Sequence, residues 1–328
     1  MDAQRGRQSF RLDNREYGIR TDKESVFEAY GNRIACRKLG IGEKMEFKTV
    51  EKLPFDAEEA MNRRVSTRSF QNKALSDNER NRLMDFYQTL SNPFGVDVRV
   101  QHIGKTEGAG NVQLGTYGTI KGAKDFLAIT VKDVPYAMEA AGYQFENLIL
   151  YATQMGLGTV WLAATFSRKD FEKAIEMEKD DLFPCICPVG YPADKKSLIE
   201  KFTRSTLGSK KRKAWDKIFF NGDFSHRLTE AEAGSYRKAL EMLRIAPSST
   251  NGQPWAVVKE GNKFHFFNNY KNSTGEDMVR IKHLDLGIGL AHFHQAALQD
   301  GLQGSMHTED ITFAAPEEMH YILTYVAE

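Results

Sequence analysis

The sequence GYQFENLILYATQMGLG, residues 142–158, decides the fold. Its apolar residues recur at every third or fourth position, which predicts a long helix over residues 136–155 with one buried face. That face carries Phe145, Leu148, Ile149, Ala152 and Met155. Helices commonly end at a glycine in the left-handed conformation, so we expect this helix to end at Gly156.

The same unit recurs in the last third of the chain. In the first unit, thirteen residues separate Gly142 from Gly156-Leu157-Gly158. In the second unit, thirteen residues separate Gly287 from Gly301-Leu302-Gln303-Gly304, at an offset of 145. The helix and strand signals near residues 75–98 are likewise repeated near residues 228–258, at an offset close to 153. This agreement in order and spacing predicts a diverged internal duplication.

Shorter elements surround these two helices. Residues 56–64 carry acids in the first turn of a predicted helix, and another helix opens at Ser76, with Glu79 in the capping-box position. Residues 96–100 alternate like a half-buried strand, and residues 126–131 form an apolar run suited to the centre of a sheet. The fold class is therefore a mixture of helix and sheet.

The composition is that of an ordinary globular protein. The 328 residues are 41% hydrophobic and 27% charged, which excludes a disordered chain, a disulfide-rich mini-protein and a fibre. Lys and Arg (45) balance Asp and Glu (44), so no strong net field favours nucleic acid or anionic lipid, and neither is expected as a partner. Because no apolar run is long enough for a membrane span and no signal-peptide core is present, we expect a cytoplasmic protein.

Several common sites are not predicted. Cys36, Cys185 and Cys187 fit neither a disulfide framework nor a zinc motif, and the last two are expected in a buried strand. The glycines of residues 156–158 lack the third glycine of a dinucleotide fingerprint. The histidines of the second long helix lack metal-ligand spacing, so they are expected as core or interface residues and no metal site is predicted; they are His283, His292 and His294.

Residues 1–44 differ from the rest of the chain, because they are polar and rich in arginine and have no apolar periodicity. Gly42-Glu43 can be encoded by a sequence that resembles a bacterial ribosome-binding site, so we expect the natural protein to begin at Met45. Residues 1–44 would then be a disordered or non-native extension; the alternative is a functional basic arm. The predicted domains are a first half over 45–206, a basic connector over 207–222 and a second half over 223–328.

Three segments carry candidate chemistry. In an extended chain Arg64, Ser66 and Arg68 face the same way and would converge on a phosphate or another oxygen-rich anion; a solvated basic turn is the alternative. Residues 246–255, APSSTNGQPW, form a rigid loop whose hydroxyl and amide groups suit the hydrogen-bonding edge of a heterocycle. The small residues of 156–165, GLGTVWLAAT, would let backbone N–H groups approach a flat ligand.

Together these segments resemble the motifs of the flavin-dependent nitroreductase family, from about residue 45 to the C-terminus. Arg64-x-Ser66-x-Arg68-x-Phe70 resembles its N-terminal motif, residues 247–255 its second motif, and residues 156–165 its Leu-Gly-Leu-Gly segment. The second motif stands in the second half of this chain, whereas Asn92-Pro93-Phe94-Gly95 occupies its usual place. In that respect the sequence resembles the subgroup labelled "Putative TM nitroreductase", in which one chain supplies both parts of an FMN site.

The resemblance implies an α+β, nitroreductase-like fold. Two diverged half-repeats would form a single-chain pseudo-dimer, with central, mostly antiparallel sheets flanked by helices. Because both parts of the site would lie in one chain, a monomer, or at most a loose dimer, is expected.

The resemblance also implies which residues hold FMN. Arg64 and Ser66 would hold the phosphate and the ribityl chain, and Arg68 would place a positive charge beside the flavin pyrimidine. Lys210 and Arg212 would complete the phosphate site. The flavin ring would be approached by Pro247, Ser248, Ser249, Asn251 and Gln253 and, near N5, by backbone groups of Leu162, Ala163 and Ala164.

The implied function is an FMN-dependent oxidoreductase that reduces nitro or quinone-like compounds with NADH or NADPH by ping-pong hydride transfer. No catalytic side chain is expected, because the flavin itself transfers the hydride. Two alternatives stay open: an FMN-binding carrier or redox sensor without turnover, and a specialised flavin-consuming or dehydrogenating relative.

Overall fold

The computed structural model describes residues 45–104, 115–194 and 211–328. The predictions for residues 1–44, for Lys210 and for a boundary at residue 206 fall outside the described residues. The elements of the first half are α2 (Ala57–Arg63), α3 (Asp77–Thr89), β1 (Val98–Gly104), β2 (Asp125–Lys132), α4 (Ala137–Gln154), β3 (Gly158–Thr159), α5 (Arg168–Glu172) and β4 (Asp181–Gly190). The second half contains β5 (Phe219–Asn221), β6 (Asp223–Arg227), α7 (Arg237–Ile245), β7 (Trp255–Glu260), β8 (Lys263–Asn269), α8 (Glu276–Gln299), β9 (Gly304–His307) and β10 (Met319–Ala327), with short 3₁₀ helices η2 (Trp215–Lys217), η3 (Gly234–Tyr236) and η4 (Ser249–Asn251).

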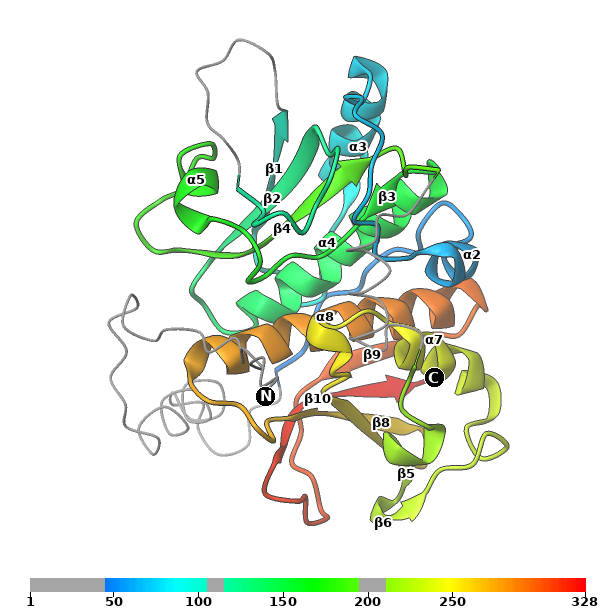
Figure 1. Cartoon of the computed structure of the whole chain (residues 1–328). Coiled ribbons are helices and arrows are strands. Elements are labelled where there is room, and N and C mark those ends of the chain that lie inside the picture. The colour runs from blue at the N-terminus through cyan, green and yellow to red at the C-terminus, as the bar shows by residue number, and fades with distance from the viewer. Residues whose placement is uncertain (1–44, 105–114, 195–210) are drawn as a thin grey trace, which may run out of the picture.

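Two sheets lie on opposite sides of the paired helices α4 and α8 (Figure 1). The first sheet has the order β1-β2-β4-β3, and the second has the order β6-β5-β7-β8-β10-β9. Between the strands named above, all pairings are antiparallel except that of β5 with β7. Strands β7-β8-β10-β9 repeat the order β1-β2-β4-β3, and in each half the long helix follows the second of these strands. The α+β class with mostly antiparallel sheets is confirmed, and the layout is consistent with a pseudo-dimer of two half-repeats.

Helices α4 and α8 meet at one glycine from each half of the chain. A Cβ on Gly142 would lie 2.1 Å from the carbonyl oxygen of Leu284, and a Cβ on Gly287 would lie 2.1 Å from that of Glu139. Leu284 follows Glu139 by the same 145 positions that separate the two glycines. Each contact is therefore the counterpart of the other, as in the interface of a two-fold dimer.

Helix α4 is buried on every side from Ala137 to Leu150, and not only on the face that the apolar spacing predicts. It is enclosed because it packs against both the first sheet and α8 (Figure 1). Gly156 and Gly301 follow the two long helices with φ of +80° and +75°, which confirms the left-handed caps. No helix in the described ranges is both long enough and apolar enough to cross a bilayer.

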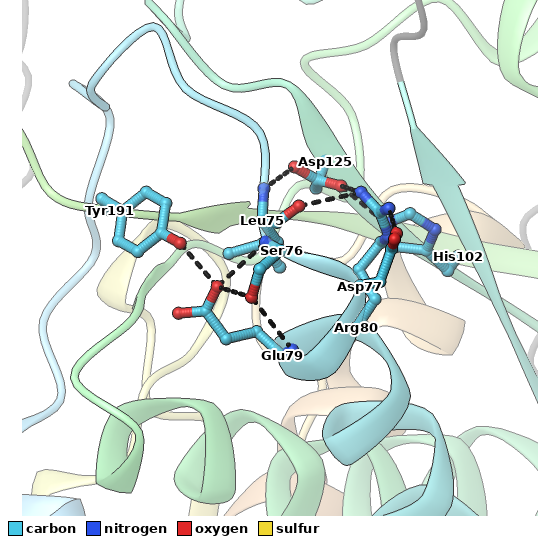
Figure 2. A network of polar contacts seen from close by, with 8 residues as sticks. All are labelled: Leu75, Ser76, Asp77, Glu79, Arg80, His102, Asp125 and Tyr191. Atoms are coloured by element: carbon cyan, nitrogen blue, oxygen red, sulfur yellow. Dashed lines mark hydrogen bonds and ion pairs between the residues drawn. The ribbon is translucent and has the colours of Figure 1, made fainter.

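Polar contacts fix the start of α3 to the first sheet (Figure 2). The Ser76 hydroxyl accepts the Glu79 N–H at 3.3 Å, and the Glu79 carboxylate accepts the Ser76 N–H at 2.9 Å, so the predicted capping box is confirmed. The buried carboxylate of Asp125 on β2 accepts the Leu75 N–H at 2.8 Å and lies 2.8 Å from His102 Nε2 on β1. These bonds hold one helix and two strands in a fixed relation.

The loop that takes the place of the second motif in the first half is closed by aromatic packing. Phe94 stacks on Tyr136 with ring centroids 5.3 Å apart, and Phe47 meets these rings edge-on at 5.2 and 5.1 Å. The Lys48 N–H donates to the Pro93 carbonyl at 2.7 Å. The first described residues of the chain therefore lie against this loop.

Two predicted segments have clear positions in the sheets. Cys185 and Cys187 are buried in β4, as predicted. Residues 207–222, predicted as a connector, include β5, whose Phe219 and Phe220 are buried and which pairs with β7. Burial of these rings makes β5 a part of the second sheet.

Candidate functional site

Residues 64–70 and residues 156–165, called the first and third motifs below, lie side by side. Ser66 forms a parallel bridge with Thr159, and the Thr67 N–H donates to the Thr159 carbonyl at 2.8 Å. A Cβ on Gly158 would lie 2.8 Å from the Thr67 side chain, so this close approach needs a glycine in the third motif.

Arg64 is a buried cation at the end of α2. Its backbone N–H donates to the Ala60 carbonyl at 2.9 Å, and its side chain is 6% exposed. Among the described residues, its Nε and Nη1 have no hydrogen-bond partner, and Nε lies 3.6 Å from the Glu146 carboxylate. Burial lowers the pKa of Arg64, and the negative charge of Glu146 opposes that shift. Buried N–H groups are nearly always bonded in native proteins, so this guanidinium is suited to an anionic ligand.

A cavity lies beside Arg64. Its lining comes mainly from the first and third motifs and consists of Arg63, Arg64, Val65, Thr67, Thr153, Gly156, Leu157, Gly158 and Pro192. Ser66 and Arg68, expected on the same side as Arg64, are not part of this lining and are partly exposed. The backbone carbonyl of Arg68 instead accepts the Lys121 N–H at 2.9 Å.

The loop between α7 and β7 has an unusual backbone. Thr250, Asn251 and Gln253 have φ of 49°, 58° and 45°, in the left-handed region that costs energy for residues other than glycine. The Gln253 N–H donates to the Ser248 hydroxyl at 2.9 Å. Strained conformations of this kind persist where surrounding contacts hold them, and they cluster at ligand-binding sites.

Residues 211–213 provide such contacts. Arg212 Nη1 donates to Asn251 Oδ1 at 2.8 Å, and Asn251 Nδ2 donates to the Lys211 carbonyl at 2.7 Å. The Lys213 N–H and Nζ donate to the side-chain and backbone oxygens of Gln253, each at 2.8 Å. The amides of Asn251 and Gln253, expected to contact a heterocycle, are thus engaged with this segment of the chain.

Arg212 brings a second positive charge toward Arg64. Its Nε and Nη2 donate to the Ile245 carbonyl, at the end of α7, at 3.1 and 2.9 Å. Burial lowers the pKa of Arg212, and the positive charges of Arg64 and Arg244 lower it further. An anion placed between Arg64 and Arg212 would relieve this repulsion.

Glu146 connects the motifs, and the sequence analysis missed it. It is fully buried on α4; its Oε2 accepts from Trp161 Nε1 at 2.8 Å, and its Oε1 lies 2.9 Å from His292 Nε2. Trp161 belongs to the third motif, whereas His292 comes from α8 of the second half. No local signal pointed to Glu146, because on the helix it lies about 100° from Phe145 and so off the face that the apolar spacing predicts to be buried.

The three histidines of α8 are buried between the halves. His283, His292 and His294 contact, in that order, Glu139, Glu146 and Tyr143 of α4. Burial lowers the pKa of His294 to about 4, so its ring is neutral near pH 7.

The rest of the third motif is partly engaged in the sheet. The Leu162 N–H and carbonyl both bond to Ile186, at 2.9 and 3.0 Å, so its backbone is not available to a ligand. The Ala163 carbonyl accepts from Arg168 at 3.4 Å, and Ala164 is exposed. Ala163 and Ala164 remain the candidates in this segment.

The start of the second-half loop lies over a buried acid of α8. Pro247, Ser248 and Ser249 are partly exposed, and the Ser249 N–H donates to Asp285 Oδ1 at 2.8 Å. Burial raises the pKa of Asp285 to about 8, although the Ser249 N–H and the charge of Lys282 oppose the shift. The carboxyl group is therefore largely protonated at neutral pH and half-protonated only near pH 8.

Comparison with known proteins identifies relatives of this fold. The chain matches the family model described as "Putative TM nitroreductase" over residues 56–297. Its structure is similar to that of a "putative nitroreductase" from Thermotoga maritima, with a TM-score of 0.51 and 17% identity, over 84% of this chain and 95% of that chain. At this identity, the likeness shows the fold alone.

Other solved structures match with lower scores. A "putative nitroreductase in complex with fmn" from Desulfovibrio desulfuricans is 19% identical, with a TM-score of 0.35, over 45% of this chain and 96% of that chain. A "Putative NADH dehydrogenase/NAD(P)H nitroreductase" from Bacteroides thetaiotaomicron is also 19% identical, with a TM-score of 0.36, over 44% and 91% of the two chains. No curated protein matches the sequence significantly.

Proposed function

Because the chain belongs to the family described as "Putative TM nitroreductase", we propose that it is an FMN-dependent oxidoreductase. The proposed electron donor is NADH or NADPH, and the proposed acceptor is a nitro or quinone-like compound. The two substrates would occupy one pocket in turn, which is a ping-pong scheme.

The proposal rests mainly on the surroundings of the Arg64 guanidinium. Its guanidinium is buried beside a cavity, its Nε and Nη1 have no hydrogen-bond partner in the described part of the chain, and it is close enough to Arg212 to affect that residue's pKa. The phosphate of FMN offers the negative charge and the oxygen acceptors that these N–H groups require. The residues present therefore fit this group.

Each predicted residue has a proposed task. Arg64 and Arg212 would hold the phosphate together with Lys210, Ser66 would bind the ribityl chain, and Arg68 would place positive charge beside the flavin pyrimidine. The ring would rest against residues 247–249 and against Ala163 and Ala164, with Asn251 and Gln253 holding the loop in shape. Bound FMN would supply the hydride chemistry.

We propose one FMN per chain and a monomeric protein. Arg64 comes from the first half and the Pro247-Ser248-Ser249 loop from the second, while Phe47, Phe94 and Tyr136 fill the corresponding loop of the first half. Flavin released from purified protein should approach one equivalent. A ratio near two, or an obligate tight dimer in sedimentation, would contradict this proposal.

An anaerobic titration tests the function. The purified protein should show the absorbance of oxidised flavin and should lose it on addition of NADH or NADPH. Initial rates with an acceptor such as a quinone should give parallel double-reciprocal lines. Bound FMN that neither nucleotide reduces would instead identify a carrier or sensor, and protein that binds no FMN would reject the proposal.

A further inference from the structure

The carboxyl group of Glu146 lies between a histidine and an arginine that come from different halves. Its Oε1 lies 2.9 Å from His292 Nε2 and 3.6 Å from Arg64 Nε. The side chains of Glu146, His292 and Arg64 are 0%, 1% and 6% exposed. Water therefore does little to screen their charges, and the net charge of the group depends on how many protons it holds.

The contact of His292 Nδ1 indicates how many protons the pair of Glu146 and His292 holds. Its Nδ1 lies 3.1 Å from the Met242 carbonyl oxygen, which can only accept a hydrogen bond. Met242 is in the last turn of α7, where carbonyl groups lack partners within the helix, so a donor is needed there. Nδ1 therefore carries a proton.

With Nδ1 protonated, the contact between His292 Nε2 and Glu146 Oε1 must hold one further proton, because two lone pairs at 2.9 Å would repel each other. Whether that proton belongs to the histidine or to the carboxyl group, the pair of Glu146 and His292 has no net charge. The charge of Arg64 is then not cancelled by its acidic neighbour.

We propose that His292 is a positioning residue that neutralises Glu146 and so keeps the positive charge of Arg64 available to the phosphate of a ligand. This inference rests on the proposed FMN site. Without His292, an ionised Glu146 would pair with Arg64 at short range and leave a neutral site. The second half would thus control the charge of a binding group that the first half supplies.

The inference can be tested with flavin-free protein by titrating FMN and riboflavin and following flavin fluorescence. His292→Gln should weaken FMN binding by about 10- to 100-fold, because it leaves Glu146 charged beside Arg64. Riboflavin binding should change less than threefold, since riboflavin lacks the phosphate. A second substitution, Glu146→Gln in the His292→Gln background, should restore FMN affinity to within about threefold of the unaltered protein.

A merely structural role predicts a different pattern, in which both ligands weaken together and the second substitution gives no rescue. That pattern, or unchanged FMN affinity in His292→Gln, would overturn the inference. Nitrogen NMR of the unaltered protein gives an independent test that needs no variant: His292 Nδ1 should be protonated between pH 6 and 8, and an unprotonated Nδ1 would overturn the inference. If the unaltered protein binds no FMN, the proposed function fails instead, so the two failures are distinguishable.

Discussion

The two halves place a loop at the same point of the fold, after a helix and before the first of four matching strands, but they use it differently. In the first half the loop between α3 and β1 is filled by Phe94, which packs with Tyr136 and Phe47. In the second half the loop between α7 and β7 exposes hydroxyl groups and is held by Arg212. One backbone plan thus supports a packed core in one place and a polar site in the other.

The long helices α4 and α8 also differ at the position that faces the second-half loop. Asp285 of α8 accepts the Ser249 N–H of the second loop, whereas the residue 145 positions earlier, on α4, is Ala140. The difference between the halves therefore lies in side chains, while the order of strands is shared.

The largest effect should follow substitution of the glycines that join the halves. Gly142→Ala and Gly287→Ala each place a Cβ 2.1 Å from a carbonyl oxygen of the opposite helix, so the helices must separate. We expect each to lower the free energy of unfolding by roughly 3 kcal/mol or more, measured by urea denaturation.

Gly301→Ala is the control, because it meets no atom within 4 Å and pays only for its left-handed backbone, about 1 kcal/mol. If alanine is tolerated at only one of Gly142 and Gly287, the two contacts between α4 and α8 are not equivalent.

The next effect concerns ligand binding. Arg64→Met should weaken FMN binding about 100-fold, because it removes the buried cation of the site. Methionine is preferred to a charge reversal, since glutamate at this position would lie beside Glu146. Arg82→Met, at an exposed position of α3, is the control. A variant that stays fully yellow would disprove the role of Arg64.

A smaller effect should follow loss of the aromatic packing in the first half. Phe47→Ala removes a partly buried ring from contact with Phe94 and Tyr136 and should cost about 2 kcal/mol of stability. FMN affinity and stoichiometry should not change, because none of these three rings lines the cavity beside Arg64. A second equivalent of FMN in this variant would show that the packing hides a second site.

The smallest expected effect, taken per pH unit, concerns Asp285. Its folded-state pKa of about 8 lies above its ordinary value, so the folded protein holds a proton that the unfolded chain releases. Stability should therefore fall as pH rises from about 4 to 8, by up to about 1.4 kcal/mol per pH unit. Asp285→Asn should flatten this dependence in denaturation measured at pH 5, 7 and 9. Asp216→Asn, at an exposed position, should leave it intact.

Local features of the fold were predictable because the residues that cause them are neighbours in sequence. Ser76 and Glu79 form the capping box three residues apart, and Gly156 ends its helix as its spacing indicates. Burial of the whole of α4 was not predictable from local spacing, since it depends on α8, which lies more than a hundred residues further along the chain.

The candidate site was predictable as a set of motifs but not as a set of contacts. Alternation in an extended chain placed Arg64 and Arg68 together, whereas in the structure Arg64 turns inward toward Glu146. The amide of Gln253 is engaged by Lys213, a contact across forty residues that no local pattern reveals. Long-range partners of this kind decide which polar groups remain for a ligand.

The reciprocal contact of Gly142 and Gly287 lies within one polypeptide. In an assembly of identical subunits, every gene substitution appears at two positions, so a residue that suits one position must also be tolerated at its mirror image. Here the two mirror positions are separate codons, and one loop can evolve toward a hydrophobic core while the other stays polar. The pairing of α4 with α8 also needs no encounter between molecules, so dilution does not dissociate it.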